Sequence, residues 1–319
     1  MDSVAGLQSA LTTAAANGQG DTINVVAGTY ALTMPLTATV SDNLSVVVVG
    51  SWNPGCSVRN AGATVLDGQQ QTAVLDIRAQ GSSAPGLGIA YLNVTRGYQD
   101  AAGSHAGAGA ALYTAGPVNV ENCSFYANHH DGSFAGGLYA YSGPGSVLTV
   151  RNNVFLDNVA AGVGAAYLTA NGGPAHVHGN TVVFNQLTGT SVVGGILAAG
   201  PGTYELANNL FWQNTGGDLF NSAGLGSGSL ALYNNDIGPV LGAAASAGSG
   251  NFSRDPQFAA GLLNLRLRSS SPLVNAGDNA PAGGIGDYDV TGARRLQGAG
   301  VDIGAYESDV LFFHGFELP

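Results

Sequence analysis

The sequence predicts an all-β fold, a parallel β-helix in which a single chain winds through stacked coils. A Phe-x-x-Asn motif returns through the middle of the chain at spacings of 30, 27 and 29 residues, which indicates a structural repeat. Between the copies, apolar and polar residues alternate in short runs, as in β-strands. The 50 Gly among 319 residues disfavour a helical solenoid, because each Gly weakens a helix interior by about 1 kcal/mol. The copies are Phe125/Asn128, Phe155/Asn158, Val182/Asn185 (with Val in place of Phe) and Phe211/Asn214.

Aligning the copies predicts columns of like residues, since each coil of a β-helix pairs with the next at about 4.8 Å. We expect the motif Asn residues to stack and bond into a ladder at a corner where Asn itself adopts left-handed backbone, with Gly97 in this place one coil earlier. A second column contains Leu92, Cys123, Asn153, Asn180, Asn209 and Asn235. A third column, two residues later and apolar throughout, contains Val94, Phe125, Phe155, Val182, Phe211 and Ile237.

Both ends of the stack are expected to be closed, because a bare sheet edge invites aggregation. The pattern of residues 1–20 predicts a helix that caps the first coil. One face of this helix carries Val4, Leu7, Leu11 and Ala14. Residues 21–250 supply the coils, although the Ala-, Gly- and Ser-rich segment from Pro239 to Gly250 is expected to leave the regular repeats. Residues 251–308 are expected to add C-terminal coils and a cap that closes the other end, and residues 309–319 form a tail, all within one elongated domain.

Composition favours an extracellular product. Only 9% of the residues are charged, the nine basic residues are all Arg, and the net charge is −11. This charge would repel nucleic acid, and also acidic polysaccharides unless cations or an Arg cluster intervened. We expect no membrane span, because no run of 18 apolar residues occurs, and Met1 does not begin a signal peptide. The oligomeric state is not predicted.

Two cysteines are present, Cys56 in a turn-rich loop and Cys123 in an inward column. The simplest interpretation of Cys123 is a small buried hydrophobe. A disulfide between the two cysteines in an oxidising compartment is the alternative.

The register also brings acid, base and cation together on an outward face. Two residues before the second column stand Glu121, Arg151, His178 and Ala207, and two residues earlier stand Asn119, Thr149, His176 and Glu205. Polysaccharide lyases and hydrolases use an Arg or Lys base or paired carboxylates, so the candidate catalytic residues are Glu121, Arg151 and His178. His176 and Glu205 are candidate ligand-binding residues beside them. The alternative is a cross-strand ion pair of Glu121 with Arg151, worth about 0.2 to 1 kcal/mol.

Tyr113, Tyr139 and Tyr141 follow Gly/Ala pairs on successive coils and are further candidate ligand-binding residues. We expect Tyr113 and Tyr139 to align, with Leu168 and Leu197 continuing their column. An outward column would offer aromatic rings to a sugar or a partner, whereas an inward column would be core packing. Both alternatives stay open.

Two clusters of charged and His residues are candidate metal sites. The loop residues His129, His130 and Asp131, with Arg96, Asp100 and His105 one coil earlier, match no known ligand spacing, and a solvated loop is favoured. Near the C-terminus, Asp287 and Asp289 could bind calcium, but a cap held by Arg294 against Asp302 or Glu307 is favoured. No cofactor and no resident metal are therefore expected.

Two resemblances extend this interpretation. The signals Phe-x-x-Asn and Gly-Gly-x-Ile, between Leu92 and Ile237, resemble the repeats of bacterial polymorphic outer membrane proteins, which belong with the pectate-lyase-like β-helices. The series Asp255-Pro256-Gln257-Phe258, Ser271-Pro272-Leu273-Val274-Asn275-Ala276-Gly277 and Val301-Asp302-Ile303-Gly304-Ala305-Tyr306-Glu307 is similar to the choice-of-anchor Q domain, although Asp289-Val290-Thr291-Gly292 replaces its usual Asp-Gly. The tail Phe312-Phe313-His314-Gly315-Phe316-Glu317 resembles a C-terminal ending of secreted Gram-negative proteins, with a strand on the last coil as the alternative. The resemblances imply a right-handed β-helix located extracellularly or on the bacterial cell surface, with any leader removed or replaced.

Three functions fit these observations. We expect a secreted or cell-surface β-helix protein, not an enzyme, that acts in adhesion or in binding a polysaccharide or cell-surface glycan. The first alternative is a polysaccharide lyase or glycoside hydrolase with an outer-face site. The second is a passenger module of a larger exported assembly. Fold alone does not decide, because this scaffold hosts many functions.

Overall fold

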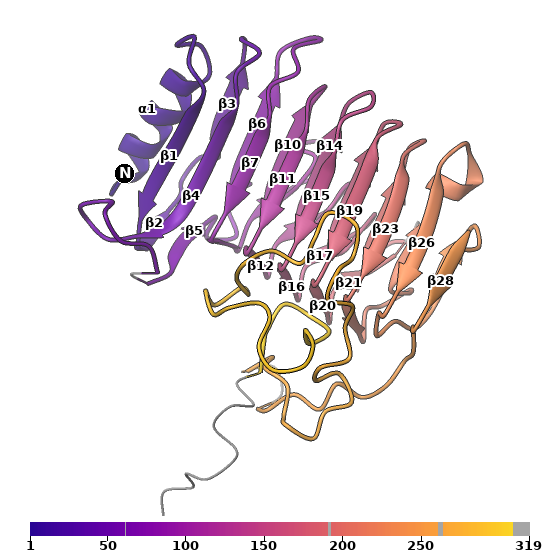
Figure 1. The fold of residues 1–319 in the computed structure, drawn as a ribbon. Coiled ribbons are helices and arrows are strands. Elements are labelled where there is room, and N and C mark those ends of the chain that lie inside the picture. The colour runs from indigo at the N-terminus through magenta and orange to yellow at the C-terminus, as the bar shows by residue number, and fades with distance from the viewer. Residues whose placement is uncertain (61, 191–192, 261–263, 309–319) are drawn as a thin grey trace, which may run out of the picture.

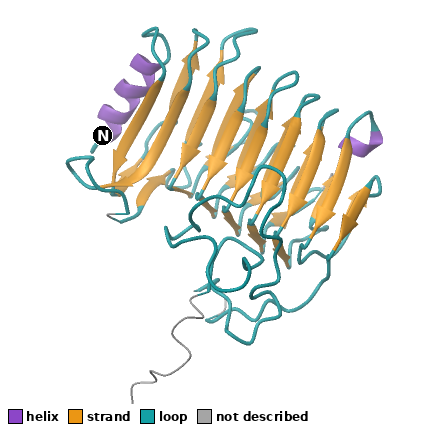
Figure 2. Ribbon diagram, in the orientation of Figure 1, coloured by secondary structure: helices purple, strands orange, loops and turns teal. Residues whose placement is uncertain are grey.

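The computed structural model describes residues 1–60, 62–190, 193–260 and 264–308 and shows a parallel β-helix of about seven turns (Figure 1). Its wall consists of parallel sheets, each built from one strand per coil, with loops between them (Figure 2). The predicted fold class is therefore confirmed. The tail 309–319, including the motif from Phe312 to Glu317, lies outside the described residues.

The described strands form four sheets, which we name I to IV in chain order. Sheet I has nine strands: β1 (Asp21–Val26), β4 (Val46–Trp52), β7 (Leu87–Ala90), β11 (Val118–Glu121), β15 (Leu148–Arg151), β19 (Pro174–His178), β23 (Thr203–Ala207), β26 (Ser229–Tyr233) and β28 (Ala247–Ser249). Sheet II has seven: β2 (Gly28–Ala31), β5 (Thr64–Asp67), β8 (Leu92–Thr95), β12 (Ser124–Tyr126), β16 (Val154–Leu156), β20 (Thr181–Val183) and β24 (Leu210–Trp212).

Sheet III is short and sheet IV closes the coil. Sheet III has four strands: β9 (Tyr98–Gln99), β13 (His129–His130), β17 (Val159–Ala160) and β21 (Gln186–Leu187). Sheet IV has eight: β3 (Leu36–Val40), β6 (Leu75–Ala79), β10 (Ala110–Thr114), β14 (Leu138–Ser142), β18 (Ala166–Ala170), β22 (Ile196–Ala199), β25 (Leu219–Asn221) and β27 (Val240–Gly242). The helices among the described residues are α1 (Val4–Ala14) and a single 3-10 turn, η1 (Ala223–Leu225).

The motif asparagines stack as predicted. Asn128 Nδ2 donates to Asn158 Oδ1, Asn158 Nδ2 to Asn185 Oδ1, and Asn185 Nδ2 to Asn214 Oδ1, each at 2.9 Å. A second ladder runs from Asn153 through Asn180, Asn209 and Asn235 to Asn251. Each of these side-chain oxygens also accepts the backbone N–H of the equivalent residue one coil earlier, so the amides satisfy buried backbone groups at two corners of the middle coils.

The backbone at these corners differs from the expectation. The left-handed residue is the one before each ladder Asn, as at Asp157 (φ 53°) and Asn152 (φ 56°). The preceding residue makes the turn and leaves the ladder Asn free to point inward. The expectation that the ladder Asn itself adopts left-handed backbone was wrong by one position.

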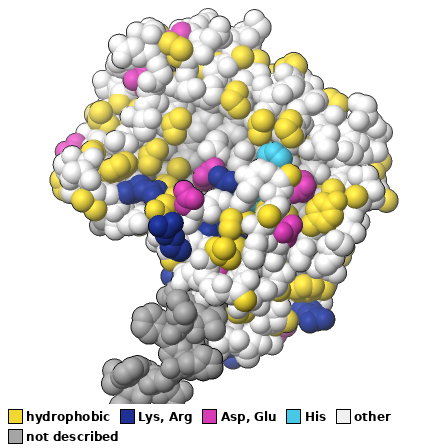
Figure 3. Space-filling model, viewed as in Figure 1, with side chains coloured by type: hydrophobic (Ala, Val, Ile, Leu, Met, Phe, Trp, Pro, Cys, Tyr) yellow, Lys and Arg dark blue, Asp and Glu magenta, His cyan; other side chains and the backbone are white. Residues whose placement is uncertain are grey.

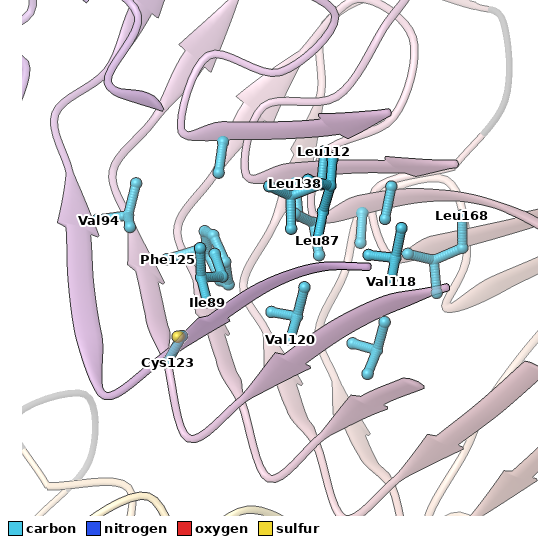
Figure 4. Close-up of a cluster of buried hydrophobic side chains, with 14 of the residues drawn as sticks. Leu87, Ile89, Val94, Leu112, Val118, Val120, Cys123, Phe125, Leu138 and Leu168 are labelled. Carbon is cyan, nitrogen blue, oxygen red and sulfur yellow. The ribbon is translucent and has the colours of Figure 1, made fainter. Parts of the chain in front are cut away.

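The inward columns form a continuous core along the coil axis. Phe125 and Phe155 stack with ring centroids 4.9 Å apart and planes 5° from parallel. Around Phe125, the side chains of Val94, Ile89 and Val120 fill the lumen of the coil (Figure 4). Cys123 is buried, as predicted, and both cysteines are free in the described structure.

Helix α1 covers the first coil, as predicted. The amide of Gly6 donates to Ser3 Oγ (3.1 Å), which caps the helix N-terminus. Leu7, Leu11 and Ala14 are buried against the core. No described helix has the length and apolar character needed to cross a bilayer.

The segment Pro239–Gly250 stays within the repeats, contrary to expectation. It supplies β27 and β28, which pair in parallel with β25 and β26. Asn251 then extends the second ladder, accepting from Asn235 Nδ2 at 2.9 Å. The pairing uses main-chain groups, so a composition of Ala, Gly and Ser does not prevent it.

The residues from 255 to 308, here called the C-terminal segment, lie along the side of the solenoid below β12, β16 and β20 (Figure 1). Their described part contains no helix or strand. Leu265, Leu273 and Ile303 pack on the outward residues Val183 and Leu210 of sheet II. The expectation that this segment closes the far end was wrong about its place, because outward apolar side chains of sheet II offer it a lateral surface.

Candidate functional site

The predicted outward residues of sheet I meet as the register required. Glu121 pairs with Arg151, and Arg151 with His178, on successive strands, while His176 pairs with Glu205. We call these five residues the charged patch. On the face seen in Figure 3, acidic and basic side chains gather near the middle of a surface that is otherwise mostly uncharged.

An ion pair occupies one half of the charged patch. Arg151 Nη2 lies 2.6 Å from Glu121 Oε1, with 16% and 23% of the two side chains exposed. This is the cross-strand ion pair that the sequence analysis gave as the alternative to catalysis. The catalytic role of Glu121, Arg151 and His178 stays a prediction.

The C-terminal segment covers the other half. Arg151 Nη1 donates to the carbonyl of Gly283 (2.9 Å), and the amide of Ala282 donates to Glu205 Oε1 (2.8 Å). His178 Nδ1 lies 3.3 Å from Gly284 O, and the His178 side chain is 2% exposed. The sequence placed these side chains on an outward face, but it carried no signal that a distant segment would cover them.

Burial controls the protonation of His178. Loss of hydration lowers the pKa of His178 to about 4, and the nearby His176 and Arg151 add to this effect. The backbone carbonyl of Gly284 opposes this lowering of the pKa, and so does the backbone of Glu205. The buried imidazole is therefore neutral at physiological pH.

The tyrosines face outward on sheet IV, but in a different register from the one predicted. Tyr113 pairs with Tyr141, and Tyr139 pairs with Tyr167. The prediction that Tyr113 and Tyr139 align was wrong by two residues. Leu168 is buried in the inward column, whereas Leu197 does follow Tyr167. Alternation along a strand keeps both tyrosine columns on the outer face despite the two-residue shift.

We call Tyr113, Tyr139, Tyr141 and Tyr167 the tyrosine strip. The rings of Tyr113 and Tyr141 are stacked, with centroids 4.4 Å apart and planes 16° from parallel. Tyr139 meets Tyr167 edge to face at 5.3 Å. Tyr113 is 39% exposed, so aromatic surface remains open to solvent. Three of these four residues are candidates from the sequence. Tyr167 is not, because the predicted register placed Leu168 in that column.

A cavity of about 330 Å³ adjoins the tyrosine strip on its β6 side. Tyr113, Tyr139 and Arg78 line it, together with Phe134 from the preceding loop, whose ring lies 5.8 Å from that of Tyr139. The buried Asp76 holds the Arg78 guanidinium through two bonds of 2.6 Å. Sequence reasoning missed both residues: Arg78 lies on β6, before the first Phe-x-x-Asn copy, and Phe134 lies in a loop.

Asp76 also joins the predicted loop cluster to this cavity. His105 Nδ1 lies 2.5 Å from Asp76 Oδ2, and His130 Nε2 lies 3.0 Å from the carbonyl of His105. His129 pairs instead with Asp131 at 2.9 Å. Within the described residues, no group of three or more His, Cys, Asp or Glu side chains is arranged to hold a metal ion.

The acidic residues Asp289 and Glu307 form bonds within the C-terminal segment. Arg295, not Arg294, forms the ion pair with Glu307 (2.7 Å), and both side chains are 1% exposed. Asp289 Oδ1 accepts from the amides of Thr291 and Ala293, and Asp289 Oδ2 from the amide of Glu307. The prediction of Arg294 was wrong because the sequence does not show which of two adjacent arginines turns inward. Calcium binding at Asp287 and Asp289 stays a prediction.

The fold and the site together define a solenoid whose outer faces carry charged and aromatic side chains. A family model described as the right handed beta helix region matches residues 46–237, so the chain belongs to this family of right-handed β-helices. Among solved structures, the crystal structure of pectate lyase Pel9A is similar, with 16% sequence identity, a TM-score of 0.46, and coverage of 95% of this chain and 90% of that one. No curated protein matches the chain.

Proposed function

We propose that the protein is a secreted or cell-surface β-helix that binds a polysaccharide or a cell-surface glycan without cleaving it, through the tyrosine strip. The observation that carries this proposal is the stacked pair of Tyr113 and Tyr141 on an outward face. Exposed tyrosine rings offer an apolar face and a hydroxyl, the combination that a sugar ring, with its C–H face and equatorial hydroxyls, can use.

The surroundings of the strip support a binding role. Rings on successive coils recur at the spacing of the strands, so an extended glycan could contact more than one coil. The cavity beside Tyr113 is large enough for part of one sugar residue, and Arg78 supplies polar N–H groups at its edge. Its bidentate bond to Asp76 neutralises the charge of Arg78, which favours a neutral or weakly acidic ligand.

The charged patch supports the absence of cleavage. An acid or base must reach its substrate, yet His178 is almost completely buried and Arg151 is bonded to Glu121 and to Gly283. The low content of charged residues and the net charge of −11 suit an outer surface of the solenoid that is solvated outside the cell.

The test is a screen of neutral and acidic polysaccharides for binding, by affinity electrophoresis, and for cleavage, by release of reducing ends and of unsaturated products. We expect binding without product. Replacing Tyr113 and Tyr141 together by Ala should weaken binding at least about tenfold, which is about 1.4 kcal/mol. Tyr233→Ala, on sheet I, is the matched control and should bind like the natural protein. Turnover of any polysaccharide, abolished by Arg151→Ala, would overturn the proposal.

A further inference from the structure

A groove runs from the corner between sheets I and II across the outside of sheet II, where the C-terminal segment leaves the first coils uncovered. Three adjoining cavities of about 540, 300 and 530 Å³ form it. The first two share Tyr91 and Asn122, and the second and third share Asn93. We call this continuous depression the flank groove. It lies on a different sheet from the tyrosine strip.

Two chain segments make the walls of the flank groove. On one side stands the loop after β4, which contributes Asn60 and Gly62. On the other side stands the C-terminal segment, which contributes Tyr288, Thr291 and Tyr306. Asn122 Nδ2 donates to the carbonyls of Tyr288 and Asp289, which fixes the second wall to the coil. The groove therefore exists only because residues far apart in the sequence are held against one another.

Two carboxylates of the flank groove are already paired with arginines. Asp67 binds Arg96 through two hydrogen bonds, and Glu121 binds Arg151. The Arg59 guanidinium lies 3.9 Å from the centre of the Tyr91 ring. Asp287, the remaining carboxylate, lines the same cavity as Arg59. A charged ligand would have to compete with these pairs, whereas a neutral ligand would not.

Uncharged polar and aromatic groups remain open. Asn93 and Ser124 point outward from β8 and β12, and their side chains have no hydrogen-bond partner within the described residues. Tyr126, on the same strand as Ser124, is 46% exposed. Free amide and hydroxyl groups beside an exposed ring are suited to the hydroxyls and the C–H face of a sugar.

We propose that the flank groove is a second carbohydrate site, which takes an extended neutral oligosaccharide lying across β5, β8 and β12. The three cavities follow one another along the surface, so they suit a chain of several sugars rather than a compact ligand. With the tyrosine strip on sheet IV, the groove would let one molecule hold two glycan chains. The groove can bind whether or not the strip does.

Calorimetric titration with cellohexaose, xylohexaose, mannohexaose and laminarihexaose tests the groove. At least one of these should bind, and the double variant Asn93→Ala, Tyr126→Ala should weaken that binding at least about tenfold, or about 1.4 kcal/mol. The control, Asn119→Ala with Tyr233→Ala, changes an exposed Asn and a half-buried Tyr on sheet I and should bind normally. Equal thermal unfolding midpoints would show that both double variants are folded.

The strip variant, Tyr113→Ala with Tyr141→Ala, separates the two sites. Binding that survives in the strip variant but not in the groove variant supports the flank groove, whatever happens to the tyrosine strip. The proposal is overturned if none of the four neutral hexaoses binds, if only oligogalacturonates bind, or if the groove variant binds as the natural protein does.

Discussion

Arg151 and Glu121, on neighbouring coils, form a 2.6 Å ion pair that also anchors the C-terminal segment, because Arg151 Nη1 donates to Gly283 O. We expect Arg151→Met to loosen residues 281–288 and to lower the free energy of unfolding by about 1.5 to 3 kcal/mol, the usual range for a hydrogen bond of a charged group. Hydrogen exchange of those backbone amides measures the loosening. Glu121→Gln, which leaves the bond to Gly283, should change exchange much less. Unaltered exchange in Arg151→Met would contradict this role.

The Asn ladder makes a strong prediction about stability. Asn158→Ala removes an oxygen that accepts from the backbone and side chain of Asn128, and an amide that donates to Phe125 O and Asn185 Oδ1. Several buried polar groups then lack partners, at about 1 to 3 kcal/mol each, so we expect a loss of several kcal/mol in urea unfolding. Asn119→Ala, on an exposed position of β11, should change stability by less than about 0.5 kcal/mol. Similar losses in both variants would argue against the ladder.

Asp236 should make stability fall as the pH rises. Burial raises the pKa of Asp236 to about 7, since its side chain is 1% exposed and Oδ2 has no hydrogen-bond partner among the described residues. The folded protein then keeps a proton that the unfolded chain releases near pH 4, so stability declines between about pH 4 and pH 7, by at most about 1.4 kcal/mol per pH unit. Unfolding in urea across this range should show a shallower decline for Asp236→Asn. The exposed Asp2→Asn, far from Asp236, serves as the control. An equal slope in all three proteins would refute the assignment.

His178 should act in the opposite direction. The pKa of His178 is lowered to about 4, so the unfolded chain takes up a proton near pH 6.5 that the folded protein refuses. This contribution to stability is complete above about pH 6.5 and is lost as the pH falls toward 4. We expect His178→Gln to remove it. In the natural protein only, we expect acidification to lower the protection factors of amides near Gly284, which are corrected for the slower intrinsic exchange in acid. Between pH 4 and 6.5 the effects of His178 and Asp236 offset each other, so the single variants are more informative than the natural protein alone.

The repeat allowed the wall of the solenoid to be predicted from sequence. Asn128, Asn158, Asn185 and Asn214 recur because each coil meets only its neighbours, which turns sequence spacing into vertical register. The same logic placed Glu121 beside Arg151 correctly. It failed for Tyr113 because the loops before β10 and β14 differ in sequence, so they do not set the register of the two strands. Aligning Tyr113 with Tyr139 by residue type alone gives the wrong pairing, since the main chain pairs Tyr113 with Tyr141.

The site could be predicted only in part, because its cover is not periodic. The alternation of residues along β19 predicts that His178 lies on the outer face. No pattern near His178 in the sequence predicts that Gly284 lies against it. Likewise Arg294 and Arg295 are equivalent by composition, and only the packing of the C-terminal segment selects Arg295 for Glu307. Contacts between a repeat and a non-repeating segment depend on shape, which spacing does not encode.

Among the coils, each ladder asparagine bonds only to the neighbouring ones, so the ladders do not set how many coils the solenoid has. Removing one whole turn would rejoin both lines of asparagine with equivalent partners, whereas removing half a turn would break both ladders. The ladders would therefore tolerate a change of length in whole turns, whereas removing the coil of Arg151, His178 or Glu205 would also remove a contact that holds the C-terminal segment.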